Sequence, residues 1–243
     1  MSKLYVVGLG PGNAEGMTGA CRTAIERADI VVGYTKYIEL ITPLYPEKPT
    51  FATPMLGEVE RCRHALALAD KGQTVAVVCS GDAGVYGMAG LILELAGEHP
   101  NVEIEIVPGV TAALAGAAIL GAPLTHDFAV ISLSDLLTPW ELIEKRLSCA
   151  AMADFCVALY NPSSKIRADY LEKACDVLLQ YKPSDTLCGI AQNIGRGGES
   201  KELMTLHELR SMKIDMFTTV FVGNTQTKKF AGKLVTPRGY RLG

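Results

Sequence analysis

Apolar runs and helical repeats alternate along the first half of the chain. Small and apolar residues recur at helical spacing in the stretches between the apolar runs, as at Ala20, Ala24 and Ala28. We expect strands at Leu4–Val7, Ile30–Val32, Thr74–Cys79 and Val102–Val107, and helices from near Ala14 to Ala28 and over Glu58–Lys71, Val85–Gly97 and Ala112–Leu120. This alternation predicts a sheet rich in parallel pairs and covered by helices.

The pattern restarts after the segment GAPLTHDF at 121–128, which interrupts the rhythm with Gly and Pro. We expect strands at Ala129–Leu133, Phe155–Tyr160, Thr186–Gln192, Glu202–Thr205 and Phe217–Val222, and helices after Pro139 and over Ala168–Gln180. The spacing of these strands indicates a mixed sheet with more antiparallel character. The predicted fold is therefore α/β, with one lobe at 1–121, a second at 122–243 and a ligand-binding cleft between them.

Composition narrows the class of protein. The 243 residues are 49% hydrophobic and 20% charged, with a net charge of −3 and no run of Lys or Arg, which argues against a nucleic-acid groove. The uncharged stretch 106–125 contains prolines and glycines, so it predicts a strand, a turn and a small-residue helix better than a membrane span. Seven scattered cysteines without a CxxC motif, and no signal-peptide pattern, predict reduced core thiols in a cytoplasmic protein.

The stretch VVGLGPG near the start looks like a nucleotide-binding corner. A dinucleotide fingerprint would place its third glycine at position 13, which is Asn13, and Pro11 has no N–H to offer a pyrophosphate. The corner therefore favours close approach of a flat ligand to the backbone and makes a nicotinamide-dependent oxidoreductase the weaker alternative.

Four further strand ends run into small or polar residues. They are VVCSGDAGVYGMAG (77–90), IVPGVTAA (106–113), ALYNPSS (158–164) and VFVGNTQT (220–227). Asp82 could bind hydroxyls or a cation, or cap the next helix. Thr111 is either an N-cap or a ligand contact, Tyr160 is a core or ligand residue, and Asn161 is typical of a turn.

These stretches, in this order over nearly the whole chain, resemble the tetrapyrrole (corrin and porphyrin) methyltransferases. The resemblance rests on GLGPG, SGDAGVYGMA, VPGVTA, HDFAVISLSDLLTPW, LYNPSS and VGN followed by TPRGY. Its most specific part, HDFAVISLSDLLTPW, implies methylation of precorrin-3B or cobalt-factor III at C-17, with ring contraction, in cobalamin biosynthesis. Another tetrapyrrole position, uroporphyrinogen-III and a non-catalytic carrier are alternatives.

The resemblance also implies a homodimer with S-adenosyl-L-methionine as cofactor, a tetrapyrrole as substrate and no metal. The implied cofactor residues are Gly81, Asp82, Val85, Thr111, Ala112, Leu159, Tyr160, Asn161, Ala191 and Thr219. The implied substrate residues are Gly10, Pro11, Gly12, Ser132, Ser134, Asp135 and Arg238. Because the chain is slightly acidic, the substrate carboxylates need local partners, for which Lys36, Lys165, Arg167 and Arg238 are candidates.

His126 and Asp127 are the candidate catalytic pair. Ring contraction requires proton transfer, and an imidazole titrates close to neutral pH. His126 is therefore expected to act as the acid or base, with Asp127 orienting the ring, and the alternative is a hydrogen-bonded hinge residue.

Overall fold

The computed structural model describes residues 2–164 and 168–241, and it divides the chain into two compact units, Met1–Ala112 and Ala113–Gly243. This division precedes the boundary expected at 121/122, because helix α5 (Ala112–Leu120) packs on the second unit. A Cβ added at Gly116 in α5 would lie 2.9 Å from the ring of Phe221, and one at Gly189 would lie 2.9 Å from Leu120. The small residues of α5 thus permit close contact with the second sheet.

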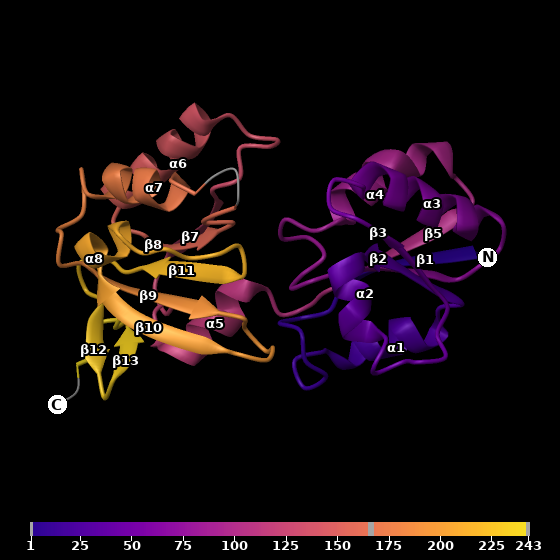
Figure 1. Cartoon of the computed structure of the whole chain (residues 1–243), viewed down its shortest axis with the longest axis horizontal. Helices are drawn as coiled ribbons and strands as arrows, with labels where there is room; N and C mark the ends of the chain where they lie inside the picture. Colours follow the sequence, from indigo (N-terminus) through magenta and orange to yellow (C-terminus); the bar gives the residue numbers. More distant parts are fainter. Residues whose placement is uncertain (1, 165–167, 242–243) are drawn as a thin grey trace. The chain divides into compact units, whose positions relative to one another are not determined.

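The first unit is built on a parallel sheet of five strands in the order β3-β2-β4-β1-β5 (Figure 1). The strands are β1 (Ser2–Gly8), β2 (Ile30–Tyr34), β3 (Thr50–Thr53), β4 (Val75–Cys79) and β5 (Val102–Val107). Because all strands are parallel, their carboxyl ends and the loops after them meet at one edge. We call this edge the glycine edge, after the glycines at 8, 10, 81 and 109.

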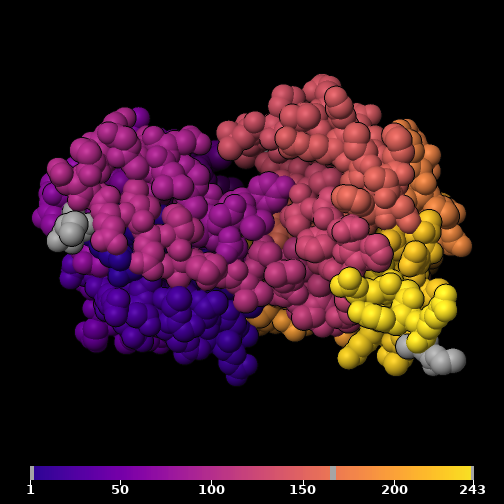
Figure 2. Space-filling model, turned by 180° about the vertical axis from the view of Figure 1, so that it is seen from behind, coloured from indigo at the N-terminus to yellow at the C-terminus, as the bar shows by residue number. Residues whose placement is uncertain are grey.

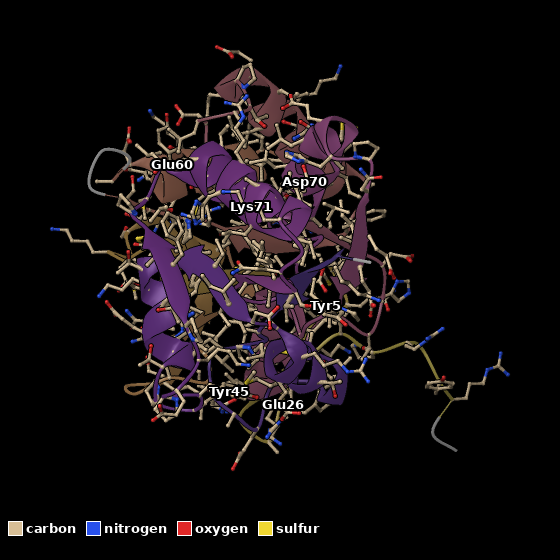
Figure 3. All side chains as sticks on the ribbon, turned by 90° about the vertical axis from the view of Figure 1, so that its right-hand side faces the viewer. Tyr5, Glu26, Tyr45, Glu60, Asp70 and Lys71 are labelled. Atoms are coloured by element: carbon tan, nitrogen blue, oxygen red, sulfur yellow. The ribbon has the colours of Figure 1, made fainter. Side chains whose placement is uncertain are left out.

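Helices cover both faces of this sheet, as alternation along β1 requires. Leu4 and Val6 pack with α3 (Glu58–Asp70) and α4 (Ala89–Leu95), whereas Tyr5 and Val7 pack with α1 (Gly19–Arg27) and α2 (Thr35–Ile41). In Figure 3, α3 carries Glu60 near its start and Asp70 at its end, and Tyr5, Tyr45 and Glu26 lie on the other side of the sheet.

The second unit contains a mixed sheet in the order β10-β9-β11-β8-β7. Its strands are β7 (Phe128–Ser132), β8 (Cys156–Tyr160), β9 (Leu187–Gln192), β10 (Ser200–Thr205) and β11 (Thr218–Val222). One face carries α6 (Trp140–Met152), α7 (Tyr170–Leu178) and α8 (Leu206–Arg210), and α5 packs on the other. The predicted α/β class, with a parallel first sheet and a mixed second one, is confirmed.

A small third sheet completes the second unit. It joins β12 (Lys228–Phe230), β13 (Lys233–Val235) and β6 (Gly121–Ala122), so the chain near its C-terminus runs beside the segment 121–122. Figure 2 shows this C-terminal part, in yellow, on the surface of the second unit. The sequence did not predict these strands, nor α2, β3 and α8, because each of them is short.

Two predicted helix starts were wrong. The helix expected near Ala14 begins at Gly19, where the hydroxyl of Thr18 accepts the N–H of Cys21 as an N-cap. The helix expected from Val85 begins at Ala89, because residues 82–88 form a loop. Both loops are therefore longer at the glycine edge than their sequence patterns suggest.

Six of the seven cysteines are buried, as expected of core residues, and all seven are free thiols. Cys149 is exposed, so its expected place in the core was wrong. Burial raises the pKa of Cys79 to about 11 and that of Cys62 to about 12, so both remain protonated near neutral pH. Within the described residues, no helix is long and apolar enough to cross a membrane.

Candidate active site

At the glycine edge the backbones of three strand ends are in contact. A Cβ added at Gly109 would lie 2.1 Å from the carbonyl oxygen of Gly81, and one at Gly8 would lie 2.7 Å from the Gly109 nitrogen. Gly10 and Gly81 exchange two backbone hydrogen bonds, of 2.9 and 2.8 Å. The glycines are therefore required for packing of the loops against one another.

This packing changes the role of the glycine corner. Gly10 is buried, its φ is +74°, and an added Cβ would lie 2.4 Å from the Gly16 carbonyl oxygen. A side chain at Gly10 would thus disturb the fold, and both backbone polar groups of Gly10 already bond to Gly81. Pro11 and Gly12, which are partly exposed on the following turn, remain the residues of this corner that a substrate could touch.

Asp82 holds two of the loops together. Its Oδ1 accepts the N–H of Gly84 at 2.8 Å and its Oδ2 accepts the N–H of Gly109 at 2.9 Å. It does not cap α4, whose N-cap residue is Met88. Since each carboxylate oxygen has a second acceptor position, the partly exposed Asp82 can still accept a hydrogen bond from a ligand hydroxyl.

Other predicted residues lie near Asp82. Thr111 and Ala112 border Gly81, because a Cβ added at Gly81 would lie 3.5 Å from the Thr111 Cα and 3.7 Å from the Ala112 nitrogen. Val85 is partly exposed on the loop 82–88. The structure therefore brings the predicted cofactor residues of the first unit together at the glycine edge.

In the second unit, polar groups gather where β7 and β8 end, and we call this the polar edge. Ser132 and Tyr160 are partners in the parallel register, and the Asn161 amide donates to Ser132 Oγ at 2.9 Å. The N–H of Ser134 donates to the same oxygen at 3.2 Å. Tyr160 accepts the N–H of Ala113, in the first turn of α5, at 2.6 Å.

Asp135 belongs to a second cluster near this edge. The hydroxyl of Tyr170 donates to its Oδ2 at 2.6 Å, and the ring of Tyr170 packs on Trp140 with centroids 4.7 Å apart. The ammonium group of Lys173 lies over the Tyr170 ring at 5.0 Å. Asp135 is thus held in place by its neighbours, as a substrate contact would need to be.

Three predicted cofactor residues lie deeper. Leu159, Ala191 and Thr219 are buried. In the register Ala191 pairs with Thr219, and Leu159 pairs with Val220, one step further from the polar edge. The side chain of Leu159 belongs to the core beneath α6 and α7. The last strand residues at this edge are their neighbours Tyr160, Gln192 and Thr218.

Gln192 and Asp215 are polar-edge residues that the sequence did not single out. Asp215 accepts hydrogen bonds from Gln192 Nε2 and Thr218 Oγ1, both at 3.0 Å. The sequence did contain a pattern that indicates this place: Asn193 directly follows β9, just as Asn161 directly follows β8. In the structure both residues have φ +52°. An Asn directly after a buried strand marks both places.

His126 and Asp127 lie at the opposite end of β7, at what we call the amino edge. Both side chains are exposed, the Nδ1 of His126 accepts the N–H of Asp127 at 3.0 Å, and it lies 3.6 Å from Asp127 Oδ2. At about 3.3 Å per strand residue, Asp127 is about 16 Å and His126 about 20 Å from Ser132. β7 therefore separates His126 from Ser132, Ser134 and Asp135, the other candidate residues of this segment.

The candidate partners for substrate carboxylates are dispersed. Lys36 is paired with Glu39 at 2.8 Å, and Arg238 is exposed beyond β13. Lys165 and Arg167 lie outside the described residues.

Known proteins resemble this chain over nearly its full length. The family model of the tetrapyrrole (corrin/porphyrin) methylases matches residues 3–210. The chain belongs to this family. Its reaction is therefore methyl transfer, and the resemblance inferred from the motifs is confirmed.

Relatives of this methylase carry more specific names. A probable cobalt-factor III C(17)-methyltransferase of Salmonella typhimurium is 46% identical to this chain over 240 residues. The match covers 98% of this chain and 100% of the relative. A precorrin-3B C(17)-methyltransferase of a Sinorhizobium species is 41% identical, and the match covers 93% of this chain and 90% of the relative. The crystal structure of the methyltransferase CobJ matches with a TM-score of 0.90 and 38% identity, over 98% of this chain and 100% of that one.

Proposed function

We propose that this methylase transfers a methyl group from S-adenosyl-L-methionine to C-17 of cobalt-factor III or precorrin-3B, with ring contraction, in cobalamin biosynthesis. The observation that carries the proposal is the 46% identity to a protein of that name over the full length of both chains. Motif resemblance over the segment from His126 to Trp140 supports the same substrate class.

We further propose the cofactor-binding roles that the resemblance implies for Asp82, at the glycine edge, and for Asn161, at the polar edge. The donor set fits this ligand: the Asp82 carboxylate can accept from ribose hydroxyls, and the Asn161 amide offers both a donor and an acceptor. A nicotinamide cofactor fits less well, because the glycine corner leads into a turn and α1 begins only at Gly19.

When bound, the cofactor would supply an electrophilic methyl group, carried on a sulfonium, to the reacting carbon of the macrocycle. The task of the protein is alignment, which can contribute about 7–11 kcal/mol of barrier reduction. Loops cross-linked through Asp82, and through Asn161 and Ser132, suit that task because their polar groups are already oriented.

Ring contraction adds a proton transfer to the reaction. His126 and Asp127 are our proposed pair for that step, although they lie at the amino edge, away from Asn161. A homodimer is also part of the proposal, and analytical ultracentrifugation of the purified protein tests it directly.

The function itself is tested by two measurements on the wild-type protein. Calorimetric titration should give binding of S-adenosylhomocysteine and none of NAD. An anaerobic assay, monitored by mass and absorption spectrum, should show addition of one methyl group to cobalt-factor III or to precorrin-3B. Methylation of uroporphyrinogen-III with neither of these accepted would refute the proposed substrate, and binding of NAD alone would refute the class.

A further inference from the structure

A buried arginine in the first unit lacks an acidic partner. Arg61 in α3 is 3% exposed, and no Asp or Glu in ranges 2–164 and 168–241 forms an ion pair with it. Its acceptors are neutral: Nε donates to Thr53 Oγ1 at 2.9 Å, Nη2 to the Pro54 carbonyl at 3.2 Å and Nη1 to Met88 Sδ at 3.8 Å. Burying an unpaired charge is costly, and an apolar side chain would fill this place at lower cost. The reason for a guanidinium at this position must therefore lie in the segments that its hydrogen bonds connect.

The three acceptors come from two separate loops at the glycine edge. Thr53 ends β3, and Pro54 opens the turn 54–57 that leads into α3. Met88 closes the loop 80–88, which carries the SGD motif, and its N–H donates to Cys79 Sγ at 3.3 Å. The planar guanidinium offers five N–H groups in a fixed fork, so it can reach all three acceptors at once, which a lysine cannot.

Both loops present exposed apolar side chains on unusual backbone. Leu56 has φ +68° and is 74% exposed, and Tyr86 has φ +55° and is 56% exposed. Met55 is 48% exposed beside Leu56. Bulky residues rarely adopt a left-handed backbone; they keep it where the surrounding structure holds them, and such residues cluster at ligand sites.

We propose that Arg61 is a positioning residue for the tetrapyrrole: by tying the turn 54–57 to Met88, it presents Met55, Leu56 and Tyr86 as one surface for the flat apolar face of the macrocycle. This proposal rests on the function proposed above. An aromatic ring and two aliphatic side chains match a planar conjugated ring in chemistry.

The cofactor end of the same loop is anchored independently of Arg61. Gly81 bonds to Gly10, and Asp82 bonds to Gly84 and Gly109. Loss of Arg61 should therefore release the part of the loop around Tyr86 while Asp82 keeps its place. The expected signature is weaker binding of the tetrapyrrole with unchanged binding of the cofactor.

The test compares Arg61→Met and Arg61→Lys with Arg63→Met, an exposed arginine on the same helix. The substrate is cobalt-factor III or precorrin-3B, whichever the wild type methylates. Both Arg61 variants should raise KM about tenfold or more with kcat nearly unchanged, the pattern of lost binding common to ground and transition states. The affinity for S-adenosylhomocysteine should stay within about twofold. A wild-type KM in Arg61→Lys would overturn the role of the fork.

Tyr86→Gly keeps the proposal testable if Arg61→Met does not fold. Glycine accepts the positive φ, and the ring it removes is exposed, so the fold should persist. The same rise in KM is expected, and a wild-type KM in Tyr86→Gly would refute the proposed surface. Wild-type protein that binds S-adenosylhomocysteine but methylates neither tetrapyrrole would instead refute the proposed function.

Discussion

The two edges of the second sheet are built for different purposes. At the polar edge, Asn161 keeps a left-handed backbone and its amide bonds to Ser132 near the surface. At the amino edge, buried hydroxyls lock the C-terminal segment in place: Thr236 Oγ1 donates to the Pro123 carbonyl at 2.8 Å and bonds to Thr227 Oγ1 at 2.8 Å. The Asn161 amide at the polar edge thus lies near the surface, whereas the Thr227 and Thr236 hydroxyls at the amino edge bond to buried groups.

The amino edge also contains a buried lysine. The Nζ of Lys182 lies 3.4 Å from Asp154 Oδ1, and Asp154 Oδ2 accepts the Thr225 hydroxyl at 2.6 Å. Such an arrangement stabilises the fold, because a buried ammonium group needs a partner. Because β7 connects the two edges, residues that are close in sequence, such as Asp127 and Ser132, lie at opposite edges of the sheet.

Asn161 and Asp82 should show the largest effects on ligand binding. Asn161→Ala removes the amide that bonds to Ser132 and places alanine at positive φ. We expect the affinity for S-adenosylhomocysteine, measured by calorimetry, to fall by about 1–3 kcal/mol. Asn161→Gly is the control, because it keeps the backbone and loses only the amide. Wild-type affinity in both variants would remove the polar edge from the cofactor site.

Asp82 tests whether the polar groups of the glycine edge bind the cofactor, as expected for those of the polar edge. Asp82→Ala removes the acceptor of the Gly84 and Gly109 N–H groups. Cofactor binding should weaken by about 1.5–3 kcal/mol, the usual range for a hydrogen bond to a charged group. Asp82→Asn, which retains one acceptor oxygen, should lose less. Equal and unchanged dissociation constants would make Asp82 a purely structural link.

Asp154 should affect stability and leave ligand affinity unchanged. Asp154→Asn weakens the partner of buried Lys182, so the free energy of unfolding should fall by about 1–3 kcal/mol at pH 7. Although burial opposes it, hydrogen bonds from Thr225 and the charge of Lys182 hold the pKa of Asp154 below its usual value. A carboxyl group with a lowered pKa in the folded state stabilises the fold at pH values above its unfolded pKa. The difference in unfolding free energy between wild type and Asp154→Asn should therefore shrink as the pH falls below about 4.

Urea unfolding at pH 7 and at acidic pH measures this difference. A constant difference between the two proteins across that range would contradict the ionic role of Asp154. A loss of S-adenosylhomocysteine affinity in folded Asp154→Asn would break the distinction between the two edges.

His126 should show the smallest effect on cofactor affinity. Its ring is exposed at the amino edge, so His126→Ala should keep the affinity for S-adenosylhomocysteine and the rate of methyl transfer within about twofold of wild type. The proposed proton-transfer role predicts a methylated, uncontracted product, since a positioned acid or base contributes about 10²–10⁴-fold. A contracted product formed at the wild-type rate would refute that role. Mass and absorption spectra of the product separate the two outcomes, with Asp127→Asn as a milder companion.

The sequence alone determined the α/β class, the principal strands, the family and most polar residues at the strand ends. An apolar run such as Val75–Cys79 reports burial directly, because a central strand covered on both faces must be apolar throughout. Asp82 and Asn161 were identifiable because each closely follows a buried strand. In each sheet, the carboxyl ends of neighbouring parallel strands and the residues after them meet at the same edge.

Only the tertiary structure decided what each residue touches. The sequence around Gly10 looks the same whether the glycine faces a ligand or another loop. Its actual partner, Gly81, follows β4 and is distant in the sequence. His126 stands six residues before Ser132 in the sequence, yet the extended strand between them carries it to the opposite edge. Arg61 reads as one more charged helix residue until the fold buries it against Thr53 and Met88. Such roles depend on contacts between distant segments, which local patterns do not encode.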